Sequence, residues 1–471
     1  MTTIAFQTRS SLPAPLEELR NSLGPGVVVV AGDPEYDEAR RVWNGMVDRY
    51  PALIARCRNV DHVIRCITAA GEHDLPLAVR GGGHNVAGFG TCDDGIVIDL
   101  GRMRDVQLDV EQRTVRVGGG ATWADVDRVT LPHGLAVPGG VVSTTGVAGL
   151  TLGGGQGWLR RTYGMTCDSL IAAEVVLADG RAVHASQSEN AELLWALRGG
   201  GGNCGVVTAF EYRLHDAGPD VAFASAVYSM DDAADLLVAF REYVLTAPDE
   251  VNATATLWTI PEHRAFPASI HGRAVIILSG LYVGEPARGE DLLRPLRQFS
   301  EPLLDMSAVL PFVAVQQLFD PFFPPTTQRY YWKSLFLNDL GDDCIRDLVA
   351  HTHQRASAQS MIVVWALGGA LARVPATATA VGDRDFPYVA EILATWGSAA
   401  DSDANITWAR ALFTALEPHG SGKVNLNFPG LGEDGDRFVR AAFDSTYDRL
   451  RELKRRYDPG NLFRLNQNVV P

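Results

Sequence analysis

The stretch RGGGHNVAG, residues 80–88, comes directly after the short apolar run 76–79 and places three consecutive glycines in front of a histidine. Glycine adopts positive φ angles and leaves main-chain N–H groups uncovered, which suits a loop that closes around a pyrophosphate. A second stretch, GVAGLTLGGGQG at residues 146–157, has the same chemistry. A sharp structural turn would account for one such loop, whereas two of them predict a large anionic ligand.

The composition narrows the class of protein. The chain has 471 residues, enough for two large domains or about three small ones. Its formal net charge of −15 repels phosphate backbones and anionic lipids, so neither nucleic acid nor a membrane surface is expected as a partner. The longest apolar stretch, residues 361–372, is about half of the roughly 20 residues that a membrane helix needs, and we expect it to be a buried strand.

The N-terminus and the cysteines indicate the compartment. The first 20 residues lack a basic region followed by an apolar core and a cleavage site, which favours a cytoplasmic location. The six cysteines are far apart, without a CxxC pair or a Cys/His zinc pattern. We therefore expect reduced thiols and no metal site.

Hydrophobic periodicity predicts two regions of different character. Before about Leu214, strands are expected at residues 76–79, 95–100, 114–117 and 173–177, and helices at 35–44 and 59–70. After about Val221, helices are expected at 231–245, 290–299 and 436–457, and a strand at 330–337. The first region is therefore α+β and holds nearly all the glycine clusters.

A third glycine stretch, GGGNCG at residues 200–205, fits the spacing of a dinucleotide-binding fingerprint. That fingerprint requires a helix directly after the glycines. Here the alternating sequence VVTAFEY, residues 206–212, predicts a strand instead. A Rossmann-type NAD site is therefore rejected.

Taken together, several ordered motifs resemble the berberine bridge enzyme-like FAD-linked oxidases, a branch of the vanillyl-alcohol oxidase superfamily, and among them the monocovalent 6-hydroxy-D-nicotine oxidase type. The motifs are RGGGH at 80–84, the 146–157 stretch, LLWALRGGGGNCGVV at 193–207 and YDPGNLFRLNQN at 457–468. The resemblance covers about residues 35–471. It implies an α+β, two-lobed FAD-binding fold of the vanillyl-alcohol oxidase type with an antiparallel-sheet substrate lobe.

The resemblance also divides the chain and implies its activity. It gives a FAD-binding domain over residues 1–217, a substrate domain over 218–427, and a C-terminal segment over 428–471 that returns to the FAD-binding domain. The activity would be that of an oxidase, which removes a hydride from a C–H next to O or N of a small organic substrate, with O₂ as acceptor and H₂O₂ as product. A flavin-dependent oxygenase of a secondary-metabolite intermediate and a catalytically altered flavin-binding protein are the alternatives, and a homodimer is left open.

Three residues decide how the resemblance places the flavin. In this family the histidine of RGGGH is bonded through a ring nitrogen to the flavin 8α-methyl carbon, which implies a covalent FAD on His84. Many relatives add a second bond from a cysteine, but Val142 stands at that position here, so attachment through His84 only is expected. Thr145 matches the position that gates oxygen near the flavin and is small enough to admit O₂.

The other cofactor-binding residues that the resemblance implies come from the glycine loops, the 193–207 stretch and the C-terminal tail. They are Arg80, Gly81, Gly82, Gly83, Asn85, Gly88, Gly146, Gly149, Gly153, Gly154, Gly157, Asn203, Gly205, Val207, Asn466 and Asn468.

On the substrate side, the 330–337 strand holds a lysine between aromatic residues. Alternation puts Tyr331, Lys333 and Leu335 on one face and Trp332 on the other. A lysine in a buried strand is costly unless it has a partner or serves a site, and similar nicotine oxidase-type flavoproteins carry a Tyr-x-Lys-Ser strand whose lysine faces the flavin. We expect Lys333 to be catalytic, with a lysine that snorkels to the sheet edge as the alternative.

The identity of a catalytic base stays open. The tyrosine that serves in the plant and sugar-oxidase branches is matched here by Asn425, which cannot abstract a proton. Tyr331, His353 and Glu417 are candidates for a substitute. Asn427 keeps its place in the motif and is expected to touch substrate or flavin, so it joins Lys333 and Tyr331 as a catalytic candidate.

Overall fold

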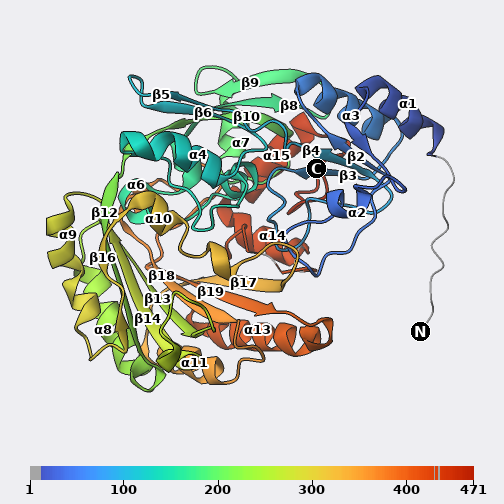
Figure 1. Cartoon of the computed structure of the whole chain (residues 1–471). Coiled ribbons are helices and arrows are strands. Elements are labelled where there is room, and N and C mark those ends of the chain that lie inside the picture. The colour runs from blue at the N-terminus through green and yellow to red at the C-terminus, as the bar shows by residue number, and fades with distance from the viewer. Residues whose placement is uncertain (1–11, 429, 433–434) are drawn as a thin grey trace.

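The computed structural model describes residues 12–428, 430–432 and 435–471, so residues 1–11 of the expected FAD-binding domain lie outside the described part. Figure 1 shows two lobes, with the blue and green N-terminal lobe above and a large sheet with its helices below. All strand pairs of that large sheet are antiparallel. The expected α+β fold of two lobes with an antiparallel-sheet lobe is confirmed.

A four-stranded sheet forms one edge of the first lobe. Its order is β1 (Val28–Val29), β2 (Leu53–Arg56), β4 (Ile96–Asp99) and β3 (Leu77–Arg80). Helices α1 (Ala14–Leu23) and α3 (Val60–Glu72) lie beside it (Figure 1). The α3 helix is the one expected at 59–70, and the Asn59 side chain caps it by accepting a hydrogen bond from the His62 N–H. The RGGGH loop begins at the end of β3.

A five-stranded antiparallel sheet completes the first lobe. Its order is β5 (Val106–Asp109), β6 (Thr114–Gly118), β10 (Val206–Arg213), β8 (Leu170–Val176) and β9 (Ala182–Ser186). Around it lie α4 (Trp123–Thr130), α5 (Val147–Leu152), α6 (Arg160–Tyr163), α7 (Ala191–Leu197) and the pair β7 (Leu135–Ala136) and β11 (His215–Asp216). The strand expected after Gly205 is confirmed as β10, which agrees with the rejection of a Rossmann site.

The second lobe is built on one large sheet. Its order is β15 (Leu304–Asp305), β12 (Asp220–Ser229), β14 (Ala274–Tyr282), β13 (Val251–Thr259), β18 (Met361–Ala366), β19 (Tyr388–Trp396) and β17 (Arg329–Leu337), and β16 (Ala308–Pro311) also pairs with β12. Helices α8 (Ala233–Thr246), α9 (Pro286–Leu293), α11 (Asp342–His353) and α13 (Ser402–Leu416) cover the face that points away from the first lobe (Figure 1). The other face meets the first lobe.

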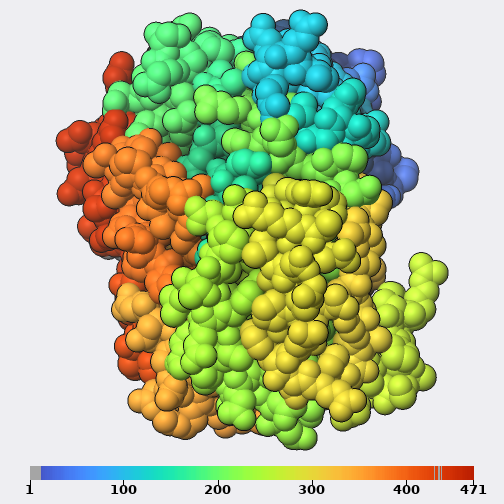
Figure 2. Space-filling view, turned by 90° about the vertical axis from the view of Figure 1, so that its left-hand side faces the viewer, coloured from blue at the N-terminus to red at the C-terminus, as the bar shows by residue number. Residues whose placement is uncertain are grey.

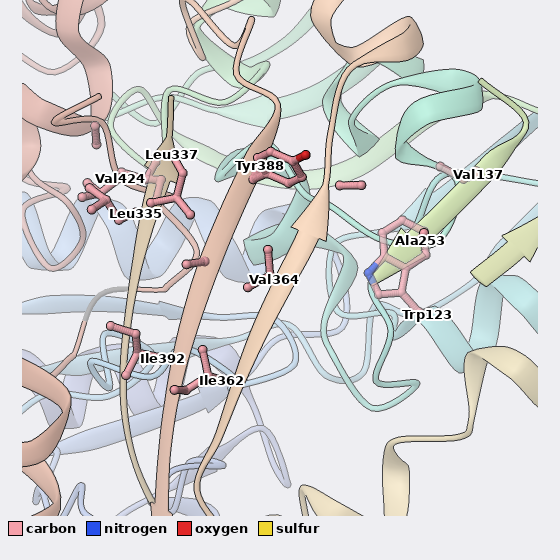
Figure 3. Close-up of a cluster of buried hydrophobic side chains, with 14 of the residues drawn as sticks. Trp123, Val137, Ala253, Leu335, Leu337, Ile362, Val364, Tyr388, Ile392 and Val424 are labelled. Carbon is pink, nitrogen blue, oxygen red and sulfur yellow. The ribbon is translucent and has the colours of Figure 1, made fainter. Parts of the chain in front are cut away.

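Alternating side chains of these strands form two separate cores. Figure 3 shows Leu335, Ile362, Val364 and Ile392 gathered on one side of β17, β18 and β19, and this cluster continues into the helices. The side chains in between, among them Trp332, belong to a second cluster that includes residues of the first lobe. Figure 2 shows the second lobe, in yellow and orange, packed directly beneath the first.

The C-terminal segment packs against the glycine stretch at 200–205. After α14 (Asp436–Phe443) and α15 (Tyr447–Tyr457), the Asn466 side chain donates to the Gly202 carbonyl at 3.0 Å. The Asn203 side chain donates to the Gln467 carbonyl at 3.2 Å and accepts from the Val469 N–H at 2.9 Å. Lys454 Nζ forms a buried ion pair with Asp458 Oδ2 at 2.6 Å and also donates to the Asn203 carbonyl at 3.1 Å.

Four elements differ from the sequence-based expectation. The helix expected at 290–299 begins earlier, as α9, and ends at Leu293, after which Arg294–Arg297 form a 3-10 helix. The helix expected at 35–44 is only α2 (Tyr36–Ala39), because the chain then turns inward and buries Trp43. The helix expected at 436–457 is broken by Asp444, which has a φ of 43°. The buried strand expected over 361–372 ends at Ala366, because Gly368 and Gly369 take φ angles of 87° and 58° and lead into α12 (Gly369–Arg373).

All six cysteines are buried free thiols. Within residues 12–428, 430–432 and 435–471, none of the helices has the length and the apolar character that crossing a membrane requires.

Candidate functional site

A cavity of about 200 Å³ lies between the two lobes. Its first-lobe wall consists of the two glycine loops, including residues 80–85 together with Val142, Thr145, Gly146 and Gly149. Its second-lobe wall is the face of the large sheet that meets the first lobe, including Trp332, Met361, Val363, Trp365, Glu391 and Leu393. A ligand here would be held between the glycine loops and the sheet.

A second cavity, of about 150 Å³, continues from the first into the N-terminal lobe. Val79, Gly81, Asn85, Gly149 and Asn427 line both cavities. The far end of the second cavity is formed by Gly201, Gly202 and Gly205 together with Leu465, Asn466 and Gln467 of the tail. The two cavities therefore form one elongated site that suits a long ligand.

The two glycine loops touch each other through their backbones. A Cβ atom on Gly82 would lie 2.5 Å from the Gly146 N and Cα atoms, and a Cβ on Gly146 would lie 2.4 Å from the Gly82 N atom. No side chain fits at either position. Gly149 is different, because nothing lies within 4 Å of the place where its Cβ would be. Its bare backbone faces the site.

His84 is half-buried at the junction of the loops and the sheet. Its imidazole stacks on the indole of Trp43, with ring centroids 4.1 Å apart and an interplanar angle of 20°, and Trp43 stacks in turn on Tyr330. Burial lowers the pKa of the His84 imidazole to about 3, so the ring is neutral at physiological pH. Its Nε2 atom is buried and has no hydrogen-bond partner. A neutral ring nitrogen with a free position is available to a ligand.

Lys333 and Tyr331 lie on the wrong side of the sheet for catalysis. The Lys333 ammonium stands over the ring of Phe413 in α13, 4.2 Å from its centroid, and Arg410 of the same helix donates to the Tyr331 hydroxyl at 2.9 Å. The predicted alternation along β17 is correct, but the face assigned to the site is wrong. Both faces of this strand carry aromatic residues, so the pattern alone does not show which one the helices cover. Trp332 reaches the cavity instead.

The other candidates for a base also lie away from the cavity. His353 is exposed at the end of α11. Glu417 is exposed and pairs with Arg437 at 3.2 Å. Neither residue is among those that line the two cavities.

Glu391 is the functional candidate that the sequence analysis missed. It lies on β19, between Val363 of β18 and Ser334 of β17 in the strand register, and is 4% exposed. Among the described residues that line the cavities, it alone carries a carboxylate. Burial raises the pKa of the Glu391 carboxyl to about 8. The signal in the sequence is a lone glutamate inside the apolar run YVAEILATW, residues 388–396.

Asn427 forms hydrogen bonds with the second glycine loop. Its side chain donates to the Gly149 and Leu150 carbonyls at 3.2 and 3.3 Å and accepts from the Gly155 N–H at 3.3 Å. It lines both cavities, so contact with substrate or flavin stays a prediction. On the opposite side, Arg80 lines the first cavity and pairs with Asp99 at 2.9 Å.

The remaining residues expected to bind the cofactor divide into two groups. Gly153, Gly205, Val207 and Asn466 line the second cavity. The others do not line either cavity. Gly88 packs on Val47, Gly154 on Met165 and Gly157 on the Gly139 carbonyl. Asn203 accepts a hydrogen bond from Val469 of the tail, and the half-buried Asn468 has a buried Oδ1 atom without a partner.

The chemistry of the elongated site fits FAD. The bare glycine backbones can follow a pyrophosphate, and the sheet wall offers aromatic surfaces to a flat ring. Several buried polar atoms around the two cavities lack a partner within the described residues, as a missing ligand would leave them. They are His84 Nε2, Asn466 Oδ1 and both side-chain polar atoms of Gln156.

Comparisons with known proteins agree with this assignment. The family model of the FAD binding domain matches residues 51–186, and the berberine and berberine-like model matches residues 424–470. The (R)-6-hydroxynicotine oxidase of Paenarthrobacter nicotinovorans is 29% identical over 460 residues, which cover 95% of this chain and 97% of that protein. An uncharacterized FAD-linked oxidoreductase of Bacillus subtilis is 29% identical over 453 residues, with 95% and 97% covered.

Solved structures show the same relationship. The crystal structure of 6-hydroxy-D-nicotine oxidase from Arthrobacter nicotinovorans has a TM-score of 0.84 at 27% identity and covers 95% of this chain and 99% of its own. A chitooligosaccharide oxidase, at 24% identity and a TM-score of 0.85, shares the fold and covers 98% of this chain and 100% of its own. This chain belongs to the berberine bridge enzyme-like FAD-linked oxidoreductases of the vanillyl-alcohol oxidase family.

Proposed function

We propose that this oxidoreductase is an oxidase, which removes a hydride from a C–H bond next to nitrogen or oxygen of a small organic molecule and passes the electrons to O₂ to give H₂O₂. The observation that carries the proposal is Glu391, a buried carboxyl on the sheet wall of a cavity whose other wall is made by the glycine loops. The hydride acceptor is supplied by FAD when it is bound in those loops. Thr145 in the loop wall is small, which leaves room for O₂.

Glu391 would accept the proton that the substrate loses. A hydroxyl or a protonated amine must give up a proton when the neighbouring C–H bond is oxidised, and a carboxylate within hydrogen-bond reach takes it. The pKa of about 8 leaves part of the Glu391 carboxyl ionised at neutral pH. Lys333 and Tyr331 have no part in this step because they face α13.

The lining of the cavity favours a flat and largely apolar substrate. Five aromatic side chains line it, those of Trp332, Trp365, Phe319, Phe323 and Phe428. An oligosaccharide needs many polar partners, whereas the polar side chains of the sheet wall are few and include Thr254 and Glu391. A ring system with one amine or hydroxyl group fits these walls.

His84 would hold FAD through a single covalent bond between a ring nitrogen and the 8α-methyl carbon. Support comes from the neutral imidazole, from the partnerless Nε2 atom and from the stacking on Trp43, which fixes the plane of the ring. Val142 lines the cavity and cannot form a thioether.

The test is a stopped-flow screen of flavin bleaching under anaerobic conditions with panels of amines, sugars and polyketide-type alcohols. We expect a ring-bearing amine or alcohol to bleach the flavin and air to restore it with one H₂O₂ per turnover. Bleaching without peroxide, with labelled oxygen in the product, would make the protein an oxygenase. If no compound in the panels reduced the flavin, the oxidase proposal would fail in favour of a flavin-binding protein.

A further inference from the structure

We infer that Trp365 and Arg160 act as positioning residues that set the proton affinity of the Glu391 carboxyl. The two residues come from different lobes, since Trp365 lies on β18 and Arg160 on α6. Only the expected effect on turnover rests on the proposed function. The protonation of the carboxyl itself can be measured separately.

The first link is a hydrogen bond across the sheet. In the β18–β19 register, Val363 lies opposite Glu391 and Trp365 lies opposite Val389, so Trp365 and Glu391 are diagonal neighbours on one face. The indole Nε1–H donates to Glu391 Oε2 at 2.8 Å. An indole N–H is a donor only, and such a bond is stronger to a carboxylate than to a neutral acid. The bond therefore favours the ionised form.

The second link is a buried cation behind the indole. The Arg160 guanidinium stands 4.5 Å from the centroid of the Trp365 ring and is 0% exposed. It donates to three main-chain carbonyls, those of Ala366, Gly157 and Ala253, at 2.8, 3.1 and 2.6 Å. Among the described residues, no carboxylate forms an ion pair with it. The positive charge of Arg160 therefore polarises the Trp365 indole and attracts the negative charge of an ionised Glu391 carboxyl.

Few other charges reach the Glu391 carboxyl. Its register neighbours, Val363 and Ser334, are uncharged. Across the cavity, burial lowers the pKa of His84 so that it is neutral, and the charge of Arg80 is balanced by Asp99. Arg160 is the cation whose charge favours the ionised form of the Glu391 carboxyl. The Trp365 bond and the Arg160 charge oppose the rise in the Glu391 pKa that burial causes.

The decisive variant is Trp365→Phe in the flavin-loaded protein. Phenylalanine keeps an aromatic ring between the lobes but removes the N–H donor, so the pKa of Glu391 should rise by about one to two units, as expected for a lost hydrogen bond to a charged group. Infrared titration would follow the carboxyl C=O band that disappears in Glu391→Gln. The matched control is Trp258→Phe, because Trp258 is a buried indole of the same sheet whose Nε1 has no partner.

Arg160→Met and Arg160→Lys separate charge from packing. We expect Arg160→Met to raise the pKa of Glu391 and Arg160→Lys to restore most of the shift. If the Arg160 variants do not fold, the Glu391 pKa measured in Trp365→Phe tests the inference. An unchanged Glu391 pKa in folded Trp365→Phe, or an equal shift in Trp258→Phe, would overturn the inference.

The pH profile of anaerobic flavin reduction links this result to turnover. Its acidic limb should move to higher pH in Trp365→Phe by the same one to two units as the infrared band. If Glu391→Gln reduces its flavin as fast as the unmodified protein, the proposed catalytic role of Glu391 fails. The infrared titration would still report whether Trp365 and Arg160 control the carboxyl, so the two failures can be told apart.

Discussion

The imidazole of His84 lies nearly flat on the indole of Trp43, with ring centroids 4.1 Å apart and the planes inclined by 20°. Trp43 is held in turn, because its Nε1–H donates to the Phe323 carbonyl at 3.0 Å and its ring stacks on Tyr330 at 3.7 Å. Phe323 and Tyr330 belong to the second lobe. The loop histidine is therefore oriented by contacts that exist only when both lobes are in place.

This orientation leads to the first prediction, on covalent attachment. Acid precipitation of the protein should leave yellow colour in the pellet, and His84→Ala should release the flavin to the supernatant because no ring nitrogen remains to carry the bond. The control is His73→Ala, since His73 is exposed at the end of α3 and lines neither cavity. Flavin in the supernatant of the unmodified protein would contradict the covalent bond.

The second prediction concerns the contact between the glycine loops. Gly82→Ala should lower the thermal stability of the flavin-free protein, because the new methyl group would lie 2.5 Å from Gly146, and overpacking of this kind costs about 1–3 kcal/mol. Gly149→Ala should leave the stability of the flavin-free protein unchanged, since its Cβ enters open space. It should instead weaken FAD binding.

The two variants thus distinguish a packing glycine from a ligand-facing one. Thermal unfolding of the flavin-free proteins gives the first effect, and titration with FAD gives the second. To keep FAD binding reversible, the titrations are made in a His84→Ala background. Equal melting temperatures for the two variants would show that the loops separate without cost.

The glycine loops and the order of the motifs could be predicted from sequence because their constraint is local. Gly82 and Gly146 must be glycine for a backbone contact, and a run of such residues is visible without knowledge of the partner. The strand at 206–213 was likewise predictable, since its alternation is a property of the segment itself. For the same reason the rejection of a Rossmann site needed no tertiary information.

The catalytic side could not be predicted in the same way. Alternation along β17 separates Lys333 from Trp332, but only the position of α13 shows which of them faces the cavity. Glu391 was missed because the role of a single glutamate in an apolar strand depends on its contacts with a neighbouring strand and with the opposite lobe, which the sequence does not show. Trp43 was not predicted as a site residue because the expected helix at 35–44 would have included it as one helical residue among others.

The third prediction compares the expected and the observed catalytic residue. Glu391→Gln should slow anaerobic flavin reduction by about 10²- to 10⁴-fold, the usual effect of losing a general base. Lys333→Met should change this rate little, because its ammonium contacts Phe413 on the helix side of the sheet. Both variants should keep the flavin spectrum of the unmodified protein. If Lys333→Met lost most of the rate and Glu391→Gln did not, Lys333 and not Glu391 would be the catalytic group.

The fourth prediction is the direction of the pH dependence. The Glu391 carboxyl accepts a proton only when ionised, and burial raises its pKa to about 8. The second-order rate constant for flavin reduction at low substrate concentration should therefore fall about tenfold per pH unit below pH 8 and level off above it.

The variant Glu391→Gln identifies the group behind that limb. Glutamine keeps an oxygen that can accept the Trp365 N–H but has no titrating proton, so the residual rate should become independent of pH between about 6 and 9. A substrate amine that titrates in the same range would leave its own limb in both proteins, and comparison of two substrates with different amine pKa values separates it. If the limb persists unchanged in Glu391→Gln with both substrates, another group titrates and Glu391 is not the base.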